Sequence, residues 1–228
     1  MASKEPLSSS PSPGSPAYRE IRADYTDTTI TVYQAYHANI AIPAVTHQSL
    51  TASPNFSLTR MTWIKPSWAW MLYRSGYSYK DERQSHILAI KLKHETFFSL
   101  LRQAVLSNAT TNREESVGKK MEKGSVIVQW DPERSIRIGK LGYRSIQIGI
   151  RKELVEEYCK GIVGIEDVTE KARTLKRVLD EEDGVGVEEL RERGLVPLER
   201  VFEVPEDVRK ILKMDRESYG TSEAEKEE

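Results

Sequence analysis

The stretch from Arg60 to Tyr77, RMTWIKPSWAWMLYRSGY, constrains the fold more than any other part of the chain. Tryptophan and other large apolar side chains are interleaved there with arginine, lysine and serine. Proline at Pro66 is a helix start signal and glycine at Gly76 is a stop signal, so we expect a strand at residues 60–65 that leads directly into a helix. Because that helix is apolar nearly all round, it should lie at the centre of the fold.

Strand and helix patterns are mixed along the rest of the chain. We expect further strands at residues 28–36, 86–92, 125–130, 134–138, 143–150, 162–165 and 200–204, and further helices at residues 38–50, 95–106, 152–159, 169–179, 187–193 and 205–212. Short turns join the three strands between residues 125 and 150, which predicts an antiparallel meander. The mixed order favours an α+β fold with a mixed, mostly antiparallel sheet over a doubly wound parallel sheet.

The two ends of the chain differ in composition from the part between them. Residues 1–17 are rich in Ser and Pro, and residues 215–228 are acidic and polar. Neither end has apolar residues to offset the entropy of ordering, so we expect both to be disordered. Residues 18–214 then form a single domain, with a polar loop at residues 108–124.

The composition argues against a membrane or secreted protein, and the net charge is too small to attract nucleic acid to the chain as a whole. No apolar stretch is long enough to span a bilayer, and the first residues lack a secretory signal, so we expect a soluble protein of the cytoplasm or nucleus without a membrane partner. The formal net charge is −1, so nucleic acid would have to meet a local basic patch. The lone Cys159 follows helically spaced apolar residues, and we interpret it as a buried structural thiol.

Standard catalytic signatures are missing from the sequence. It has no Gly-rich phosphate loop, dinucleotide fingerprint, nucleophile elbow or His pair at zinc spacing. The histidines lack a second ligand three or four residues away, so we expect no metal site.

The first candidate site is the group of Arg60, Lys65, Ser67 and Arg74 within the tryptophan-rich stretch. A cation beside apolar surface needs an anion, an aromatic face or access to water. The end of a strand and the start of a helix also expose backbone N–H groups, which together with Lys65 would seat a phosphate. In the alternative interpretation Arg74 pairs with an internal carboxylate, and Lys65 extends its ammonium to water.

The second candidate site combines QWDPER, residues 129–134, with YRSIQIGI, residues 143–150. In the latter segment the isoleucines face one side of a strand and the polar residues face the other. Asp131 and Glu133 would lie in the adjoining turn and are the carboxylates that we nominate for acid or base catalysis. The alternative is a structural turn with a surface ion pair. The polar candidates of this site are Gln129, Arg144, Ser145 and Gln147.

Several segments resemble the family catalogued as domain of unknown function 4291. They are VYQAY at residues 32–36, RMTWIKPSWAWMLYRSGY at 60–77, VQWDPER at 128–134, YRSIQIGI at 143–150 and IEDVT at 165–169. The resemblance covers roughly residues 18–180. It implies that these segments are the family's signature, and it brings no activity with it.

A broader analogy is with folds similar to ADP-ribosyltransferases, which place a polar residue on an early strand and a Glu on a late one. In that analogy Gln34 or Tyr36, Ser67 and Glu133 take these roles, although VYQAY lacks the usual Arg or His. NAD would then be the cosubstrate, and Glu133 would orient its ribose.

Three hypotheses of function follow from these patterns. The first is a nucleotide-using transferase with a phosphate site, the second is a module that binds or processes RNA or single-stranded nucleic acid, and the third is a non-catalytic interaction protein whose tryptophans are core. Convergence of the polar candidates on one cleft would favour a site. The residues for that comparison are Lys65, Arg74, Gln129, Glu133, Arg144 and Gln147.

Overall fold

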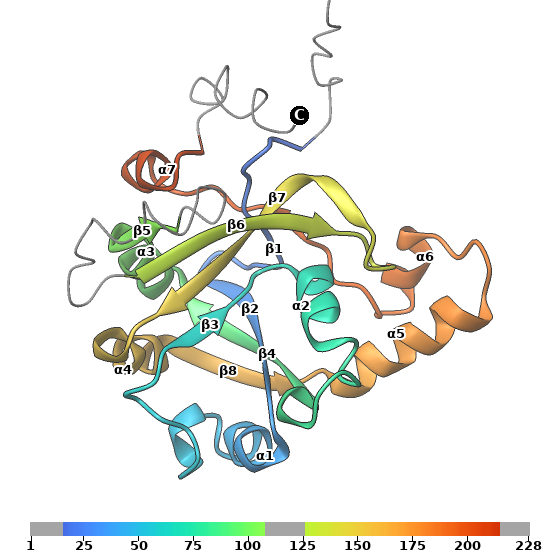
Figure 1. Ribbon diagram of the computed structural model, residues 1–228, viewed down its shortest axis with the longest axis horizontal. Helices are drawn as coiled ribbons and strands as arrows, with labels where there is room; N and C mark the ends of the chain where they lie inside the picture. The colour runs from blue at the N-terminus through green and yellow to red at the C-terminus, as the bar shows by residue number, and fades with distance from the viewer. Residues whose placement is uncertain (1–15, 108–125, 215–228) are drawn as a thin grey trace, which may run out of the picture.

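The computed structural model describes residues 16–107 and 126–214, and within these ranges the chain forms an α+β fold (Figure 1). The strands are β1 (Arg22–Ala23), β2 (Thr29–Tyr36), β3 (Thr62–Ile64), β4 (His86–Lys93), β5 (Ala104–Leu106), β6 (Val126–Arg134), β7 (Lys140–Ile150), β8 (Ile162–Asp167) and β9 (Arg200–Val201). The helices are α1 (Ala38–His47), α2 (Trp68–Ser75), α3 (His94–Arg102), α4 (Lys152–Gly161), α5 (Thr169–Glu181), α6 (Val187–Glu192) and α7 (Glu206–Leu212), with 3-10 turns η1 (Leu50–Ala52) and η2 (Glu82–Gln84). None of the helices in these two ranges is long and apolar enough to cross a membrane. The expected loop at 108–124 lies outside the described residues, as do nearly all of the expected disordered ends.

Two sheets carry most of the strand pairing. One has the order β2-β4-β8 and is antiparallel throughout, and the other has the order β3-β7-β6-β5 with only the β5–β6 pair parallel. A short third sheet pairs β1 with β9. The backbones of Tyr33 in β2 and Lys65, just after β3, exchange two hydrogen bonds of 2.7 and 3.2 Å. This bridge holds the two large sheets together, and the mostly antiparallel α+β prediction is confirmed.

Helices cover the sheets from several sides (Figure 1). On one side α3 packs against α4 and α7, and on another α2 shares an apolar cluster with α5. The larger core includes the inward faces of β2, β4, β6 and β7. Ile146, Ile148 and Ile150 of β7 are buried in it, as their alternation predicts.

Helix α2 begins and ends where the sequence predicts. The Ser67 hydroxyl accepts a hydrogen bond of 3.0 Å from the backbone N–H of Trp70, as an N-cap does. Gly76 ends the helix with a left-handed φ of 57°, which glycine adopts without steric cost. Trp68 and Trp70 are buried, so the expectation of a central helix is confirmed.

The three-stranded meander predicted for residues 125–150 is wrong: the strand expected at residues 134–138 does not form, because residues 135–139 are the turn of a two-stranded hairpin. Residues 126–134 form the single strand β6, which pairs with β7 in a hairpin whose turn comes after Arg134. Pro132 is tolerated inside the strand because β5 pairs only with residues 126–128, so that this part of β6 is a sheet edge. Asp131 and Glu133 therefore lie in a strand and not in a turn.

The helix expected at residues 95–106 is also shorter than predicted. It ends at Arg102, and residues 104–106 form β5, which runs parallel to β6. Val105, expected on the buried face of the helix, is 40% exposed. Hydrogen bonds between the backbones of β5 and the distant strand β6 stabilise residues 104–106 as a strand, although their sequence has the periodicity of a helix.

Candidate functional site

A cleft of about 590 Å³ opens between the end of β2, the segment before β3 and the side of α2 that carries Met71 and Arg74. This volume is typical of a pocket for a small ligand. Six of the predicted site residues line it. They are Gln34, Tyr36, Arg60, Lys65, Arg74 and Gln147.

Cations dominate the charge of this cleft. Arg60, Lys65, Arg74 and Arg83 line it, and none of the described residues in its lining is Asp or Glu. Arg83 forms an ion pair of 2.6 Å with Asp81, whereas the structure shows no ion pair for the other three in the part of the chain it describes. Three positive side chains therefore face the cleft without a carboxylate bound to them.

Lys65 is the most buried of these cations, with 4% of its surface exposed. Its Nζ lies 5.7 Å from the centre of the Trp70 ring, within the range of a cation–π contact. The pKa of Lys65 is lowered to about 7: burial is the main cause, the charge of Asp131 opposes it, and the charge of Arg74 adds to it. The ammonium is thus held at a cost that an anionic ligand would reduce.

The inner wall of the cleft is a hydrogen-bonded group of polar side chains. Gln34 donates to Thr62 Oγ1 at 2.6 Å and to the carbonyl of Trp63 at 3.0 Å, and it accepts from the Tyr158 hydroxyl at 2.8 Å. The hydroxyls of Tyr36 and Thr62 lie 3.2 Å apart. Because all its amide atoms have partners, Gln34 positions β2 against β3 and leaves little bonding capacity for a ligand.

Trp63 lines the cleft because a glycine lies beside it. A Cβ atom on Gly149 would lie 2.8 Å from two atoms of the Trp63 ring, closer than any real contact. On the same face of β7, Gln147 donates a hydrogen bond of 3.0 Å to Gln129. Gln129 thus contacts a residue of the cleft without being part of its lining.

Glu133 lies outside the lining of the cleft and is 5% exposed. Its Oε1 accepts from the Ser67 hydroxyl at 2.9 Å and from the backbone N–H of Arg134 at 2.7 Å. Burial raises the pKa of Glu133, although these bonds and one from Ser145 oppose the shift. Ser67, Ser145 and Glu133 therefore form a buried group that joins β6 and β7 to the start of α2.

The sequence analysis placed Asp131 and Arg144 in one candidate site, but neither residue lines the cleft. Asp131 is close enough to Lys65 for their charges to interact, and burial raises the pKa of its carboxyl despite that cation. Arg144 donates a hydrogen bond of 2.8 Å to the Tyr18 hydroxyl, and its charge lowers the pKa of Asp131. The two predicted groups thus meet through Lys65 and Asp131, while Arg144 acts on Asp131 from outside the cleft lining.

Sequence reasoning missed Glu199, which contacts the start of α2. Its Oε1 accepts from the backbone N–H of Trp68 at 2.6 Å. Burial raises the pKa of Glu199 to about 8, and the charge of Glu133 adds to the shift. No local pattern marks this residue, because its partner is more than a hundred positions away in the chain.

Other residues of the cleft that sequence reasoning missed come from the segment after α1. Asn55, Phe56 and Ser57 line the cleft, and the Phe56 ring meets Tyr36 edge to face with 6.2 Å between centroids. The only available signal was an aromatic residue in a polar loop, which occurs often on protein surfaces.

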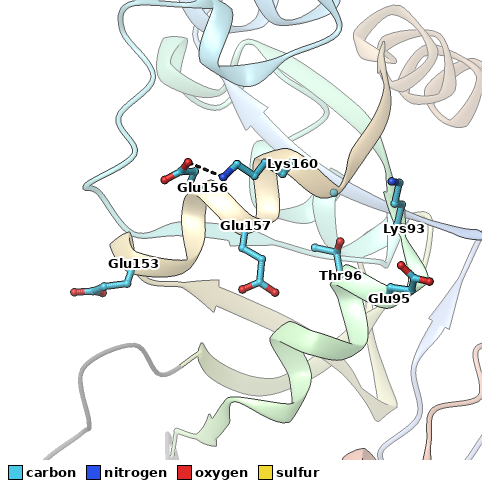
Figure 2. A pocket seen from close by; sticks show the side chains of 8 residues that line it. Lys93, Glu95, Thr96, Glu153, Glu156, Glu157 and Lys160 are labelled. Atoms are coloured by element: carbon cyan, nitrogen blue, oxygen red, sulfur yellow. Dashed lines mark ion pairs between the residues drawn. The ribbon is translucent and has the colours of Figure 1, made fainter.

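A second hollow lies between α3 and α4 (Figure 2). Glu153, Glu156 and Glu157 line it from α4, and Lys160 pairs with Glu156 at 2.8 Å. The labelled side chains lie along the surface and do not point toward one centre. Within residues 16–107 and 126–214 no cluster of His, Cys, Asp or Glu is placed to hold a metal ion.

Cys159 is half-buried beside the larger core. Burial raises the pKa of its thiol to about 11, so the thiol stays protonated at neutral pH. This environment suits the structural role predicted for it.

Comparison with known proteins identifies the family of the chain. No protein with a curated description matches the chain. The family described as Domain of unknown function (DUF4291) matches residues 20–202, a span that contains the cleft, α2 and Glu199. The chain therefore belongs to the DUF4291 family.

Proposed function

We propose that the cleft binds a nucleotide or another small phosphate-bearing ligand, with the phosphate among Arg60, Lys65 and Arg74. The observation that carries this proposal is the set of three cations that line one cleft without a carboxylate in its described lining. Such cations repel one another, and an anion relieves that repulsion. Arginine also presents paired N–H donors that match the oxygens of a phosphate.

The rest of the cleft suits the base or sugar of a nucleotide. Tyr36, Phe56 and Trp63 line it as aromatic side chains, and Asn55 and Gln147 add amide groups. Aromatic surface beside cations favours a ligand that has both a flat ring and a negative charge. A small nucleotide also fits the volume better than a protein segment would.

A transfer reaction that uses NAD extends this proposal. Asp131 interacts with Lys65 through its charge, whereas Glu133 is engaged by Ser67 and the Arg134 N–H. We therefore assign acid–base work to Asp131, and we assign Glu133 to holding α2 in place. Asp131 does not line the cleft, so in this scheme it would accept the proton of the attacking group through Lys65.

Binding is tested by isothermal titration calorimetry with AMP, ADP, ATP and NAD, and with inorganic pyrophosphate. We expect at least one nucleotide to bind, and Arg74→Met to weaken that binding by about tenfold or more because it removes a charged hydrogen-bond donor. Lys80→Met is the matched control, since Lys80 is exposed and outside the lining. Absence of binding by every nucleotide, or equal loss in both variants, would overturn the proposal.

The nucleic-acid hypothesis is separated by the same measurements. A single-stranded RNA would bind with a steep dependence on salt and with affinity that grows with length. A mononucleotide that binds as tightly as an oligonucleotide would remove this alternative. Turnover of labelled NAD then distinguishes a transferase from a protein that only binds.

A further inference from the structure

Lys65 has an unusual position for a lysine. Its backbone is fixed in the bridge to Tyr33, so the residue cannot shift without separating the two sheets. Its side chain is 4% exposed and lines the cleft, and Nζ has the Trp70 ring as its neighbour. In the described part of the chain no side chain or backbone atom forms a hydrogen bond or an ion pair with this Nζ. The backbone of Lys65 is thus fixed, and no hydrogen-bond or ion-pair partner among the described residues blocks its amine.

The charged groups that face Lys65 come from two elements. Arg74 lies on α2 and Asp131 lies on β6, and their effects on the amine oppose each other. Burial is the largest influence and lowers the pKa of Lys65 to about 7. A substantial fraction of the molecules then carries the neutral amine at neutral pH. A neutral amine has the lone pair that a nucleophile needs.

We propose that Lys65 captures the aldehyde carbon of a phosphate-bearing sugar as a Schiff base while Arg60 and Arg74 hold the phosphate. The inference rests on the proposed function, because the two arginines must bind the phosphate before the amine meets the carbonyl. It narrows the ligand class to sugar phosphates, including nucleotides with a free reducing ribose. Such sugars open to an aldehyde, and the open form carries phosphate and carbonyl on one short chain.

The step needs no oxidant or reductant. The lone pair of Nζ attacks the carbonyl carbon, the new C–N bond forms, and the π electrons of the C=O bond move to oxygen, which takes up a proton. The nitrogen then loses its proton, and its lone pair forms the C=N bond as the protonated hydroxyl leaves as water. The balance is amine plus aldehyde to imine plus water, and solvent in the open cleft exchanges the protons.

Capture is tested by reductive trapping on the full chain. The protein is incubated at pH 7 with ribose 5-phosphate and cyanoborohydride, which reduces the imine to a stable amine, and the modified lysines are mapped by peptide mass spectrometry. We expect Lys65 to be modified about tenfold or more over the exposed Lys80. Ribose without phosphate should reduce the modification of Lys65 about tenfold. Equal labelling of exposed lysines, or equal labelling by ribose, would overturn the inference.

Variants separate this inference from the proposed binding function. Lys65→Arg removes the nucleophile, so we expect trapping at position 65 to be lost, and binding of ADP is measured separately on the wild-type protein. Lys80→Arg should retain trapping at Lys65. Arg74→Met should reduce trapping of ribose 5-phosphate about tenfold more than it reduces the slow reaction with ribose, which tests the inference even if the Lys65 variant does not fold.

The calorimetric binding of ADP and the reductive trapping of Lys65 together separate the nucleotide site from the Schiff base. If ADP binds and Lys65 is not trapped, the Schiff base is wrong and the nucleotide site stands. If neither occurs, both are wrong. Trapping that depends on phosphate without binding of ADP would support this inference and restrict the site to sugar phosphates.

Discussion

The hydroxyl of Ser67 donates a hydrogen bond of 2.9 Å to Glu133 and also accepts one of 3.0 Å from the backbone N–H of Trp70. Glu133 in β6 therefore orients the residue that caps α2. Since α2 carries Arg74 and follows directly after Lys65, the position of two cleft cations depends on a carboxylate that does not line the cleft. Glu133 contributes to the site by positioning.

Removal of Glu133 is expected to destabilise the protein. Glu133→Ala leaves the Ser67 hydroxyl and the Arg134 N–H without a buried partner, which costs about 2–3 kcal/mol. Glu133→Gln retains an acceptor oxygen and should cost about 1 kcal/mol. Chemical denaturation measures both, with the exposed Glu203→Gln as control. A normally stable Glu133→Gln variant that loses turnover would instead identify Glu133 as catalytic.

Glu199 is expected to make stability depend on pH. Its pKa is about 8 in the folded state and has the ordinary carboxyl value when unfolded, so between about pH 5 and 8 the folded state binds a proton that the unfolded state releases. The free energy of unfolding should therefore fall as pH rises through this interval. Glu199→Gln should flatten that slope in denaturation curves measured at several pH values. An unchanged slope would contradict the assignment.

Replacement of Lys65 is expected to separate binding from stability. Because the folded state holds a buried cation that forms no ion pair, Lys65→Met should melt at the same temperature or higher at pH 6–7 and should lose nucleotide binding. The pKa of Lys65 is lowered, so its contribution to stability rises with pH between about 7 and 10.5, and the variant should lack this rise. A loss of about 3–5 kcal/mol would point instead to a buried ion pair.

Gly149 is expected to be required for the shape of the cleft. Gly149→Ala places a methyl group on the Trp63 ring and should cost about 1–3 kcal/mol while it weakens ligand binding. Gly142→Ala on the same strand is the control, since no atom lies within 4 Å of its added Cβ. If the clash is the cause, the double variant with Trp63→Ala should be less destabilised than the sum of the single variants.

Local chemistry was enough to predict several elements of this protein. The Ser67 cap and Gly76 stop define α2, and the alternation of isoleucines defines the buried face of β7. These signals depend on neighbours within a few residues, so they can be read along the chain. For the same reason the polar candidates near α2, including Lys65 and Arg74, were found before their partners were known.

Tertiary structure decided which candidates meet. Pairing with β7 draws the QWDPER segment into a strand, which turns Glu133 toward Ser67 and brings Asp131 near Lys65. The partners of Glu133 and Glu199 at the start of α2 lie 66 and 131 residues away. Contacts over such separations depend on how the sheets and helices pack, and no local periodicity encodes them. The sequence by itself determined most of the elements and the basic character of the site, and only the packing decided the paths of β5 and β6 and which side chains face the cleft.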